Sequence, residues 1–265
     1  MTSGATYLDD IVAWHRRRAA ADDRDIVALR RDAMSAVPSG GSRFVDALRA
    51  APRLAVIAEV KRRSPSKGDI AIDLDAGVLA EEYARGGAAC VSVLTDTPHF
   101  GGAPADLAAA RSAGLPLLRK DFTVDERDVL DARLMGADAV LLIVAALSDD
   151  ELRRFMEVAA EMRLSALVEV HDEAELGRAL SAGATLVGVN QRDLRTFAVD
   201  TQRAERLGGL MPAGVVAVAE SGITSADDAW RCAQSGYRAV LVGEHLVRAA
   251  DRAKALGELQ VALPS

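Results

Sequence analysis

Aromatic residues and cysteines are scarce in this 265-residue sequence. Phe, Trp and Tyr make up 4% of the chain while hydrophobic residues make up 50%, so Ala, Val, Leu and Ile must form the core. The two cysteines, Cys90 and Cys232, belong to no C-x-x-C pair and lie in apolar surroundings. We therefore expect two buried free thiols, and neither a disulfide framework nor a cysteine zinc site.

Motifs of several enzyme classes are also missing. The sequence has no G-x-S-x-G nucleophile elbow, and no G-x-G-x-x-G follows its first apolar run. No H-E-x-x-H or comparable spacing connects the four histidines, which are His15, His99, His171 and His245. These absences weigh against a serine hydrolase and a dinucleotide-binding domain, and they predict no metal centre.

An excess of positive charge and a long apolar run are lacking too. The formal net charge is −7, which argues against a nucleic-acid or anionic-membrane partner but leaves room for a local basic pocket. The longest apolar run, residues 139–147, is shorter than the ~20 residues that span a bilayer. Asp9 and Asp10 stand where a signal peptide would be basic and then apolar. We expect a cytoplasmic protein.

What the sequence does contain is a regular alternation of apolar runs and segments with helical spacing. The apolar runs are almost continuous, which is typical of parallel strands buried on both faces, and they cover residues 54–60, 90–94, 115–118, 139–144, 166–170, 186–189, 215–219 and 239–242. The helical segments between them cover residues 74–85, 104–112, 126–135, 149–162, 172–181, 201–207 and 225–234. Eight such units predict an α/β fold of the (β/α)8 TIM-barrel type, with an open doubly wound sheet as the alternative.

The first fifty residues lie outside this alternation. Apolar residues at positions 7, 8, 11, 12 and 14 fall on one face of a helix. Nothing that resembles a linker separates this segment from the first strand. We predict a single barrel domain over residues 1–265, in which residues 1–50 form an N-terminal helical extension of one or two helices packed on the barrel.

Charged and amide side chains follow the apolar runs. Glu59 and Lys61 are two residues apart, so in a strand they point to the same side. Two charged side chains buried deep in a core would destabilise the fold by several kcal/mol. At the carboxyl ends of barrel strands, where active sites lie, the same side chains can contact a substrate. Other runs end in a similar way, with Lys120, Glu169, Asn190 and Glu220. Ionisable groups that converge in this manner perturb each other's pKa values, as acid–base catalysis requires.

The last two runs open into segments suited to phosphate. The seventh is followed by Ser221-Gly222 and the eighth by Gly243-Glu244. Barrel phosphate sites are often built from the loops after these two strands, with backbone N–H groups directed at the anion. Ser64, Ser66 and Lys67 offer further donors after the first run. We predict a small phosphorylated substrate.

Taken in order, several motifs give the chain a resemblance to indole-3-glycerol phosphate synthases. The motifs are IAEVKRRSPSKGDI, LLRKDFTVDERDV, ALVEVHDEAEL, VGVNQRDLRTF, AESGI and LVGEHLV, and YLDDIVAWHRRR resembles the helical extension of the family. The resemblance implies a carboxy-lyase of tryptophan biosynthesis that acts without cofactor or metal. It would convert 1-(2-carboxyphenylamino)-1-deoxyribulose 5-phosphate into indole-3-glycerol phosphate, CO₂ and water. We expect a monomer.

The resemblance also implies roles for residues at the strand ends. Lys120 matches the general acid at the ribulose carbonyl, and Glu169 the proton-transfer group of the dehydration. Lys61 matches a lysine that binds the substrate carboxylate, Glu59 an assisting carboxylate and Asn190 an orienting amide. We further expect a neighbouring lysine to lower the pKa of Lys120.

Other positions are implied to contact substrate. Glu220 and Ser221 match further residues of the catalytic mouth. The aromatic ring and the rest of the substrate would meet Ser64, Phe100, Phe122, Leu141, Arg192 and Leu194. The phosphate would meet Ser221, Gly222, Gly243 and Glu244.

Two other functions fit parts of this pattern. An isomerase of a phosphoribosyl-anthranilate-like substrate would favour an Asp or Cys acid–base pair at the first and sixth strands, where this chain has Glu59, Lys61 and Asn190. A non-catalytic barrel that binds an anionic metabolite would keep the phosphate loops without the acid–base groups. The sequence has both features, which favours the synthase.

Overall fold

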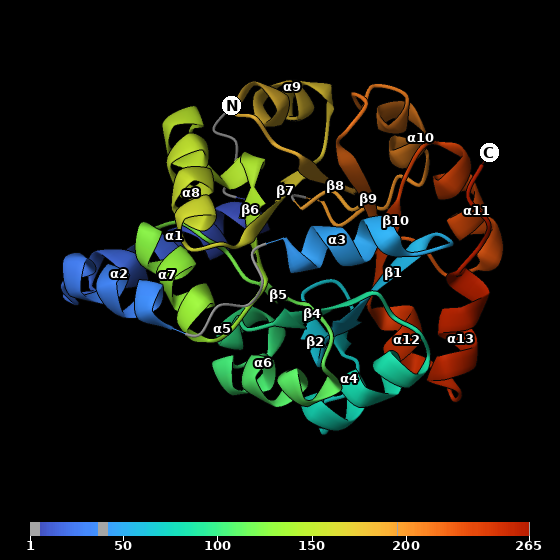
Figure 1. Ribbon diagram of the computed structural model, residues 1–265, viewed down its shortest axis with the longest axis horizontal. Coiled ribbons are helices and arrows are strands. Elements are labelled where there is room, and N and C mark those ends of the chain that lie inside the picture. The colour runs from blue at the N-terminus through green and yellow to red at the C-terminus, as the bar shows by residue number, and fades with distance from the viewer. Residues whose placement is uncertain (1–5, 37–41, 195, 265) are drawn as a thin grey trace.

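A closed barrel of parallel strands forms the centre of the protein (Figure 1), and the computed structural model describes residues 6–36, 42–194 and 196–264. Around the barrel the strand order is β1-β10-β9-β8-β7-β6-β5-β4. The predicted (β/α)8 barrel is confirmed, and the open doubly wound sheet is excluded. The barrel strands are β1 (Ala55–Val60), β4 (Cys90–Leu94), β5 (Leu117–Lys120), β6 (Ala139–Ile143), β7 (Ser165–Val170), β8 (Leu186–Asn190), β9 (Val216–Glu220) and β10 (Ala239–Val242).

The third barrel strand lies further along the chain than predicted. The sequence placed it at residues 115–118, but β5 is Leu117–Lys120. Leu117 pairs with Val91 of β4, and the residue before it is a proline, which has no N–H to donate to a ladder. The strand therefore ends at Lys120, two residues later than predicted.

The predicted helices form around the barrel, with ends that differ from the predicted ones by a few residues at most. Side-chain caps explain several starts: Ser148 accepts the N–H of Glu151, and Ser225 accepts that of Asp228. These helices are α4 (Ala76–Arg85), α6 (Pro104–Ala110), α7 (Glu126–Leu134), α8 (Asp149–Glu161), α9 (Glu173–Ser181), α10 (Gln202–Gly208) and α11 (Ala226–Gln234). The sequence analysis missed the short elements β2 (Arg63–Ser64), β3 (Gly68–Asp69), α5 (Thr97–Phe100), α12 (Glu244–Arg248) and α13 (Arg252–Leu259).

Side chains of each barrel strand alternate between two apolar clusters. One cluster fills the barrel and includes Ile57, Leu118 and Leu167. The other lies between the strands and the outer helices, and it includes Val56 and Leu142. Burial on both faces explains why the strands read as continuous apolar runs.

Three helices precede the barrel, where one or two were predicted: α1 (Tyr7–Ala20), α2 (Ile26–Ser35) and α3 (Arg43–Ala50). Helix α3 crosses the barrel end at which the strands begin (Figure 1), and its Phe44 and Leu48 are fully buried in the barrel cluster. Residues 1–5 and 37–41 of the predicted extension lie outside the described residues.

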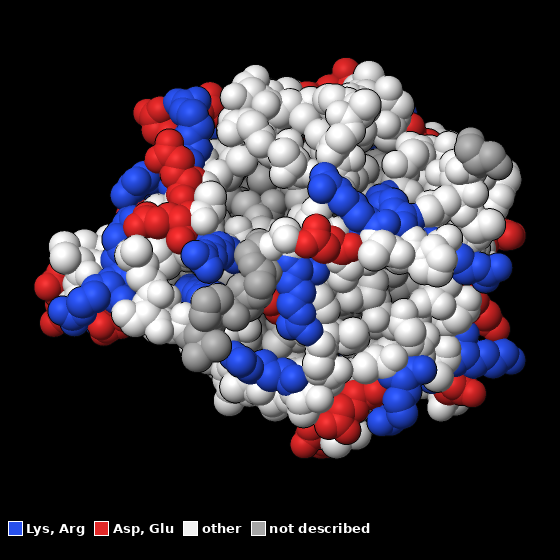
Figure 2. Space-filling model, in the orientation of Figure 1, with Lys and Arg blue, Asp and Glu red and all other residues white. Residues whose placement is uncertain are grey.

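Acidic and basic side chains are interspersed along the edge that α2 and α8 form (Figure 2). Ion pairs connect these elements, because Arg30 of α2 pairs with Glu126 of α7 and Arg154 of α8 pairs with the same carboxylate. Among the described helices, none combines the length and apolar character needed to cross a bilayer.

Candidate active site

A cavity of about 550 Å³ lies at the carboxyl ends of the barrel strands. The strand ends predicted to converge do meet there, because β1, β5, β7, β8 and β9 all contribute to its walls. Every residue that the sequence assigned to the site lines this cavity: Glu59, Lys61, Ser64, Phe100, Lys120, Phe122, Leu141, Glu169, Asn190, Arg192, Leu194, Glu220, Ser221, Gly222, Gly243 and Glu244.

Lys120 lies between two carboxylates at the centre of the site. Its Nζ atom is 3.4 Å from Glu169 Oε2 and 3.4 Å from Glu220 Oε2. Burial lowers the pKa of Lys120, but the charges of Glu169, Glu220 and Glu59 outweigh burial and raise it. The predicted lowering by a neighbouring lysine is therefore wrong. The second lysine, Lys61, is paired with Glu59, whose Oε2 lies 2.6 Å from its Nζ.

Glu169 is almost completely buried and keeps its charge through its neighbours. Burial raises the pKa of Glu169, whereas the charges of Lys120 and His171 and a hydrogen bond from Asn190 lower it, and the net result is below the ordinary value. Asn190 Nδ2 donates to Glu169 Oε1 at 3.1 Å. The backbone N–H of Arg192 donates to Asn190 Oδ1 at 3.0 Å, which fixes the amide orientation.

Glu220, unlike Glu169, has a pKa above its ordinary value. Burial raises its pKa, the charge of Lys120 lowers it, and Glu169 and Glu59 raise it again, to about 8. Neither of its carboxyl oxygens accepts a hydrogen bond from the described residues. Glu220 therefore holds a proton at neutral pH beside an ionised Glu169, and two carboxyl groups with separated pKa values are the arrangement that acid–base catalysis uses.

Apolar side chains form one wall of the cavity. Phe100 and Phe122 come from the segments after β4 and β5, with ring centroids 6.3 Å apart. Leu141 of β6 and Leu194 belong to the same apolar cluster. Phe197, which the sequence did not predict, also lines the cavity. Such a wall suits the flat apolar ring of a substrate.

The segments after β9, β10 and β1 form the part of the cavity with donors for an anion. Ser221 and Gly222 have successive positive φ angles of +65° and +72°, a conformation that can direct adjacent backbone N–H groups at one anion. Gly243 leaves space for the ion pair of Glu59 and Lys61, since a Cβ there would lie 2.3 Å from Glu59 Oε2. Lys67 and Arg248 also line the cavity, and Arg248 was not predicted.

His171 is a neighbour of the site that the sequence analysis left without a role. Its Nε2 lies 3.5 Å from Glu169 Oε1. The available signal was its position two residues after Glu169, which places both side chains on one side of an extended chain. For Arg248 the sequence signal was weaker. It lies four residues after Glu244, a spacing that places both side chains on the same face of a helix.

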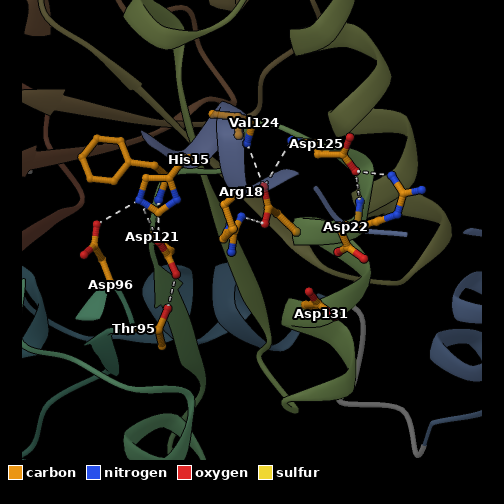
Figure 3. A network of polar contacts seen from close by, with 12 residues as sticks. His15, Arg18, Asp22, Thr95, Asp96, Asp121, Val124, Asp125 and Asp131 are labelled. Atoms are coloured by element: carbon orange, nitrogen blue, oxygen red, sulfur yellow. Dashed lines mark hydrogen bonds and ion pairs between the residues drawn. The ribbon is translucent and has the colours of Figure 1, made fainter. Parts of the chain in front are cut away.

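Two histidines that are far apart in the sequence meet at Asp96, next to the cavity residues Asp121 and Phe122. His15 Nε2 of α1 lies 2.9 Å from Asp96 Oδ2 (Figure 3), and His99 Nδ1 lies 2.9 Å from the same oxygen. These three side chains could ligate a metal, which the separation of the histidines in sequence did not predict. However, His15 Nδ1 has no partner among the described residues, so a metal on Nε2 would leave a buried N–H unpaired. Hydrogen bonding alone accounts for the cluster.

Comparison with known proteins identifies the family. Residues 8–259 match the family model for indole-3-glycerol phosphate synthase. The indole-3-glycerol phosphate synthase of Nocardioides sp. is 50% identical over 258 residues, covering 93% of this chain and 95% of the relative. Indole-3-glycerol phosphate synthase 2 of Streptomyces coelicolor is 50% identical over 237 residues, covering 89% and 90%.

A structural comparison gives a more distant likeness. Thiamine phosphate pyrophosphorylase from Pyrococcus furiosus aligns with a TM-score of 0.58 and 20% identity, covering 80% of this chain and 95% of that protein. At this identity the likeness supports the barrel fold alone. The sequence relatives span nearly the whole length of both chains, and the chain belongs to the indole-3-glycerol phosphate synthase family.

Proposed function

We propose that this protein closes the indole ring of 1-(2-carboxyphenylamino)-1-deoxyribulose 5-phosphate, releasing CO₂ and water to form indole-3-glycerol phosphate. Membership of the family supports the reaction. The observation that carries the proposed residue roles is the position of the Lys120 ammonium between Glu169 and Glu220 in a cavity that also has an apolar wall and anion-binding loops.

In the first step, the ring carbon that bears the carboxylate attacks the ribulose carbonyl carbon. Lys120 donates a hydrogen bond to the carbonyl oxygen and transfers its proton as that oxygen becomes an alkoxide. The raised pKa of Lys120 is no obstacle, because an alkoxide is a stronger base than an amine. The ring–carboxylate bond then breaks, CO₂ leaves, and its electron pair restores the aromatic ring.

In the second step, the new hydroxyl group leaves as water. Glu220, which holds a proton at neutral pH, supplies that proton, and the ionised Glu169 removes a proton from the adjacent CH₂ carbon. Glu169 can return its proton to Lys120, 3.4 Å away, and Glu220 is recharged from solvent. One proton is consumed per turnover, which balances the conversion of a carboxylate into neutral CO₂.

The remaining residues hold the substrate. Lys61, kept in place by Glu59, attracts the substrate carboxylate, and the wall around Phe100 and Phe122 receives the aromatic ring. The backbone of Gly222 and Gly243, with Arg248, receives the phosphate. Anchoring both ends of a flexible chain brings ring carbon and carbonyl together, so binding energy is used for orientation.

The isomerase alternative lacks its acid–base pair, because the ends of β1 and β8 place Glu59, Lys61 and Asn190 in the cavity rather than Asp or Cys, and the nearby Cys and Asp do not replace them. Cys90 is fully buried in the barrel cluster. Asp121 lines the cavity, but its carboxylate is engaged by Arg119 at 2.9 Å and by Thr95 at 2.6 Å. A binding protein without catalysis would have no use for a buried lysine between two glutamates.

We also propose that the enzyme works as a cytoplasmic monomer, with this metabolite rather than nucleic acid or a membrane as its partner. The net charge of −7 supports the choice of partner. The residues proposed to bind and convert the substrate meet in one cavity of a single chain, which supports a monomer as the working unit. Sedimentation equilibrium should give a mass close to 27.9 kDa.

Substitution of Lys120 by Ala tests the central assignment. We expect turnover to fall by about 10²–10⁴-fold because the proton donor at the carbonyl is lost. Product is followed by indole fluorescence with the carboxyphenylamino sugar phosphate. Lys254→Ala is the matched control, since Lys254 lies on α13 with its side chain 74% exposed. Normal turnover of folded Lys120→Ala would refute the role.

A further inference from the structure

The carboxylate of Glu169 is in contact with a residue that does not line the cavity. His171 Nε2 lies 3.5 Å from Glu169 Oε1, and the His171 side chain is 11% exposed. On its other side, His171 Nδ1 lies 3.0 Å from Glu175 Oε2 of α9, and the backbone N–H of His171 donates to the same oxygen at 2.8 Å. The imidazole is therefore held between two carboxylates.

These contacts determine how the ring is protonated. A carboxylate only accepts hydrogen bonds, so Nδ1 must carry a proton to bond Glu175. In a neutral ring the lone pair of Nε2 would then face the carboxylate of Glu169, which is unfavourable. In an imidazolium, the positive charge of the ring lies beside Glu169 instead. Nε2 makes no hydrogen bond to the described residues, and its contact with Glu169 Oε1 at 3.5 Å is an ion pair.

The charges around His171 agree with an imidazolium. Burial lowers the pKa of His171, but the hydrogen bond to Glu175 and the charges of Glu169 and Glu175 raise it above the ordinary value, against a smaller lowering by Arg203 of α10. Glu169 itself also faces Lys120 of β5. The charges of Lys120 and His171 both lower the pKa of Glu169.

We infer that His171, oriented by Glu175, is a positioning residue of the ring-closing reaction: as an imidazolium it forms an ion pair with Glu169 and keeps this carboxylate ionised beside Lys120 and Asn190. The inference rests on the proposed function, in which Glu169 must be ionised before each turnover to accept the CH₂ proton. It gives Glu175, outside the cavity, an indirect part in the chemistry.

The first test observes the ring without using activity. Imidazole ¹⁵N resonances are titrated in the full chain, and His171→Asn identifies the His171 signals among those of the four histidines. We expect both nitrogens of His171 to be protonated at neutral pH, with a pKa above about 6.5, and we expect Glu169→Gln and Glu175→Gln each to lower it. A ring that titrates at its ordinary pKa and ignores Glu169→Gln would overturn the inference.

The second test measures how the single-turnover rate depends on pH. Removing the positive charge in His171→Asn raises the pKa of Glu169, so the acid limb of the rate profile should move to higher pH by about one unit. Because His171 does not touch the cavity, KM should change little. Glu175→Gln should shift the limb less, and the double variant should match His171→Asn, since Glu175 acts through His171.

Glu173→Gln is the control for the lost charge, because Glu173 is exposed in the first turn of the same helix. It should leave the acid limb unchanged. Coincident limbs for His171→Asn and the unchanged protein would overturn the inference while leaving the proposed function intact. If the unchanged protein does not convert the substrate at all, the proposed function fails, and the imidazole titration still decides whether His171 and Glu169 are coupled.

Discussion

At the scale of single residues, a glycine makes room for the buried carboxyl group of Glu220, which is proposed to take part in the reaction. A Cβ on Gly188 would lie 2.1 Å from Glu220 Oε1, so Gly188→Ala must displace that side chain. We expect kcat to fall by about 10²-fold, the typical effect of misplacing a reacting group by about 1 Å. The measurement is kcat by indole fluorescence, with circular dichroism to verify the fold.

Gly177→Ala is the matched control. Gly177 lies inside α9, and a Cβ there would meet no atom within 4 Å. This variant should keep its activity and gain about 0.5–1 kcal/mol of stability, because alanine loses less backbone entropy in a helix. Equal activity of the two variants would contradict the steric argument.

The protonation of Glu220 should be visible in the stability of the protein. Its pKa of about 8 in the folded state exceeds the ordinary value of about 4.3, so between these values the folded protein holds a proton that the unfolded chain releases. The free energy of unfolding must then fall as pH rises through this window. Glu220→Gln cannot ionise, and relative to the unchanged protein it should gain stability from about pH 5 to about pH 8.

Urea denaturation across this pH range measures the effect. A stability difference between Glu220→Gln and the unchanged protein that is constant with pH would show that Glu220 is ionised in the folded state. Glu244→Gln serves as a comparison, because Glu244 is also a cavity glutamate but is less buried and is paired with Arg248 at 3.2 Å.

Strand ends revealed the site residues, but the sequence could not reveal their pairing. Alternation along a strand places Glu59 and Lys61 on one side, and the barrel places their neighbours at the same mouth. Which ammonium faces which carboxylate depends on distances between strands that are far apart in the chain. For this reason the sequence predicted a lowered pKa for Lys120, whereas carboxylates at 3.4 Å raise it.

At the scale of elements, a buried contact should hold α1 on the barrel more strongly than exposed ion pairs hold the turn between α1 and α2. His15 is 2% exposed, bonds Asp96 and lies with its ring centroid 5.3 Å from that of Phe122 (Figure 3). We expect His15→Ala to cost about 2–4 kcal/mol.

Arg24→Ala should cost less than about 1 kcal/mol, although Arg24 pairs with both Asp22 and Asp131, because its side chain is 45% exposed and the pairs are screened by water. Urea unfolding of both variants compares the two costs. A larger cost for Arg24→Ala would contradict the view that burial, rather than the number of ion pairs, fixes the N-terminal helices.

Long, periodic elements were predictable and short ones were not. Helix α8 has a capping box and acidic residues in its first turn, so the sequence alone located it. The hairpin of β2 and β3 has two residues per strand, too few for periodicity to register. The hairpin follows β1 and places Ser64 in the cavity. Ser64 was therefore predicted as a site residue although the element that holds it was not.

At the scale of the whole molecule, the barrel could be predicted because the sequence contains eight strand–helix units whose strands read as buried on both faces. The position of α3 could not be predicted, because nothing in its local sequence says that it covers the end of the barrel where the strands begin. That placement depends on Phe44 and Leu48 filling the same core as strand residues from Ala55 to Leu241. Single-domain organisation over residues 1–265 stays a prediction.

Phosphate bound at the proposed site should stabilise the whole fold. A ligand that binds only the folded protein raises its stability by mass action, by about 2.7 kcal/mol at a hundred times Kd. Inorganic phosphate should therefore raise Tm in a saturable way, by about 2–4 °C per kcal/mol. Sodium chloride at the same ionic strength should not, because the proposed site requires directed N–H groups at Gly222 and Gly243.

Arg248→Gln distinguishes this site from general salt effects. Arg248 lines the cavity beside Gly243, so its loss should move the phosphate midpoint to higher concentration while the response to sodium chloride stays the same. Equal responses to both salts in the unchanged protein would place the phosphate elsewhere. The same result would remove the anchor that is proposed to turn binding energy into orientation of the reacting carbons.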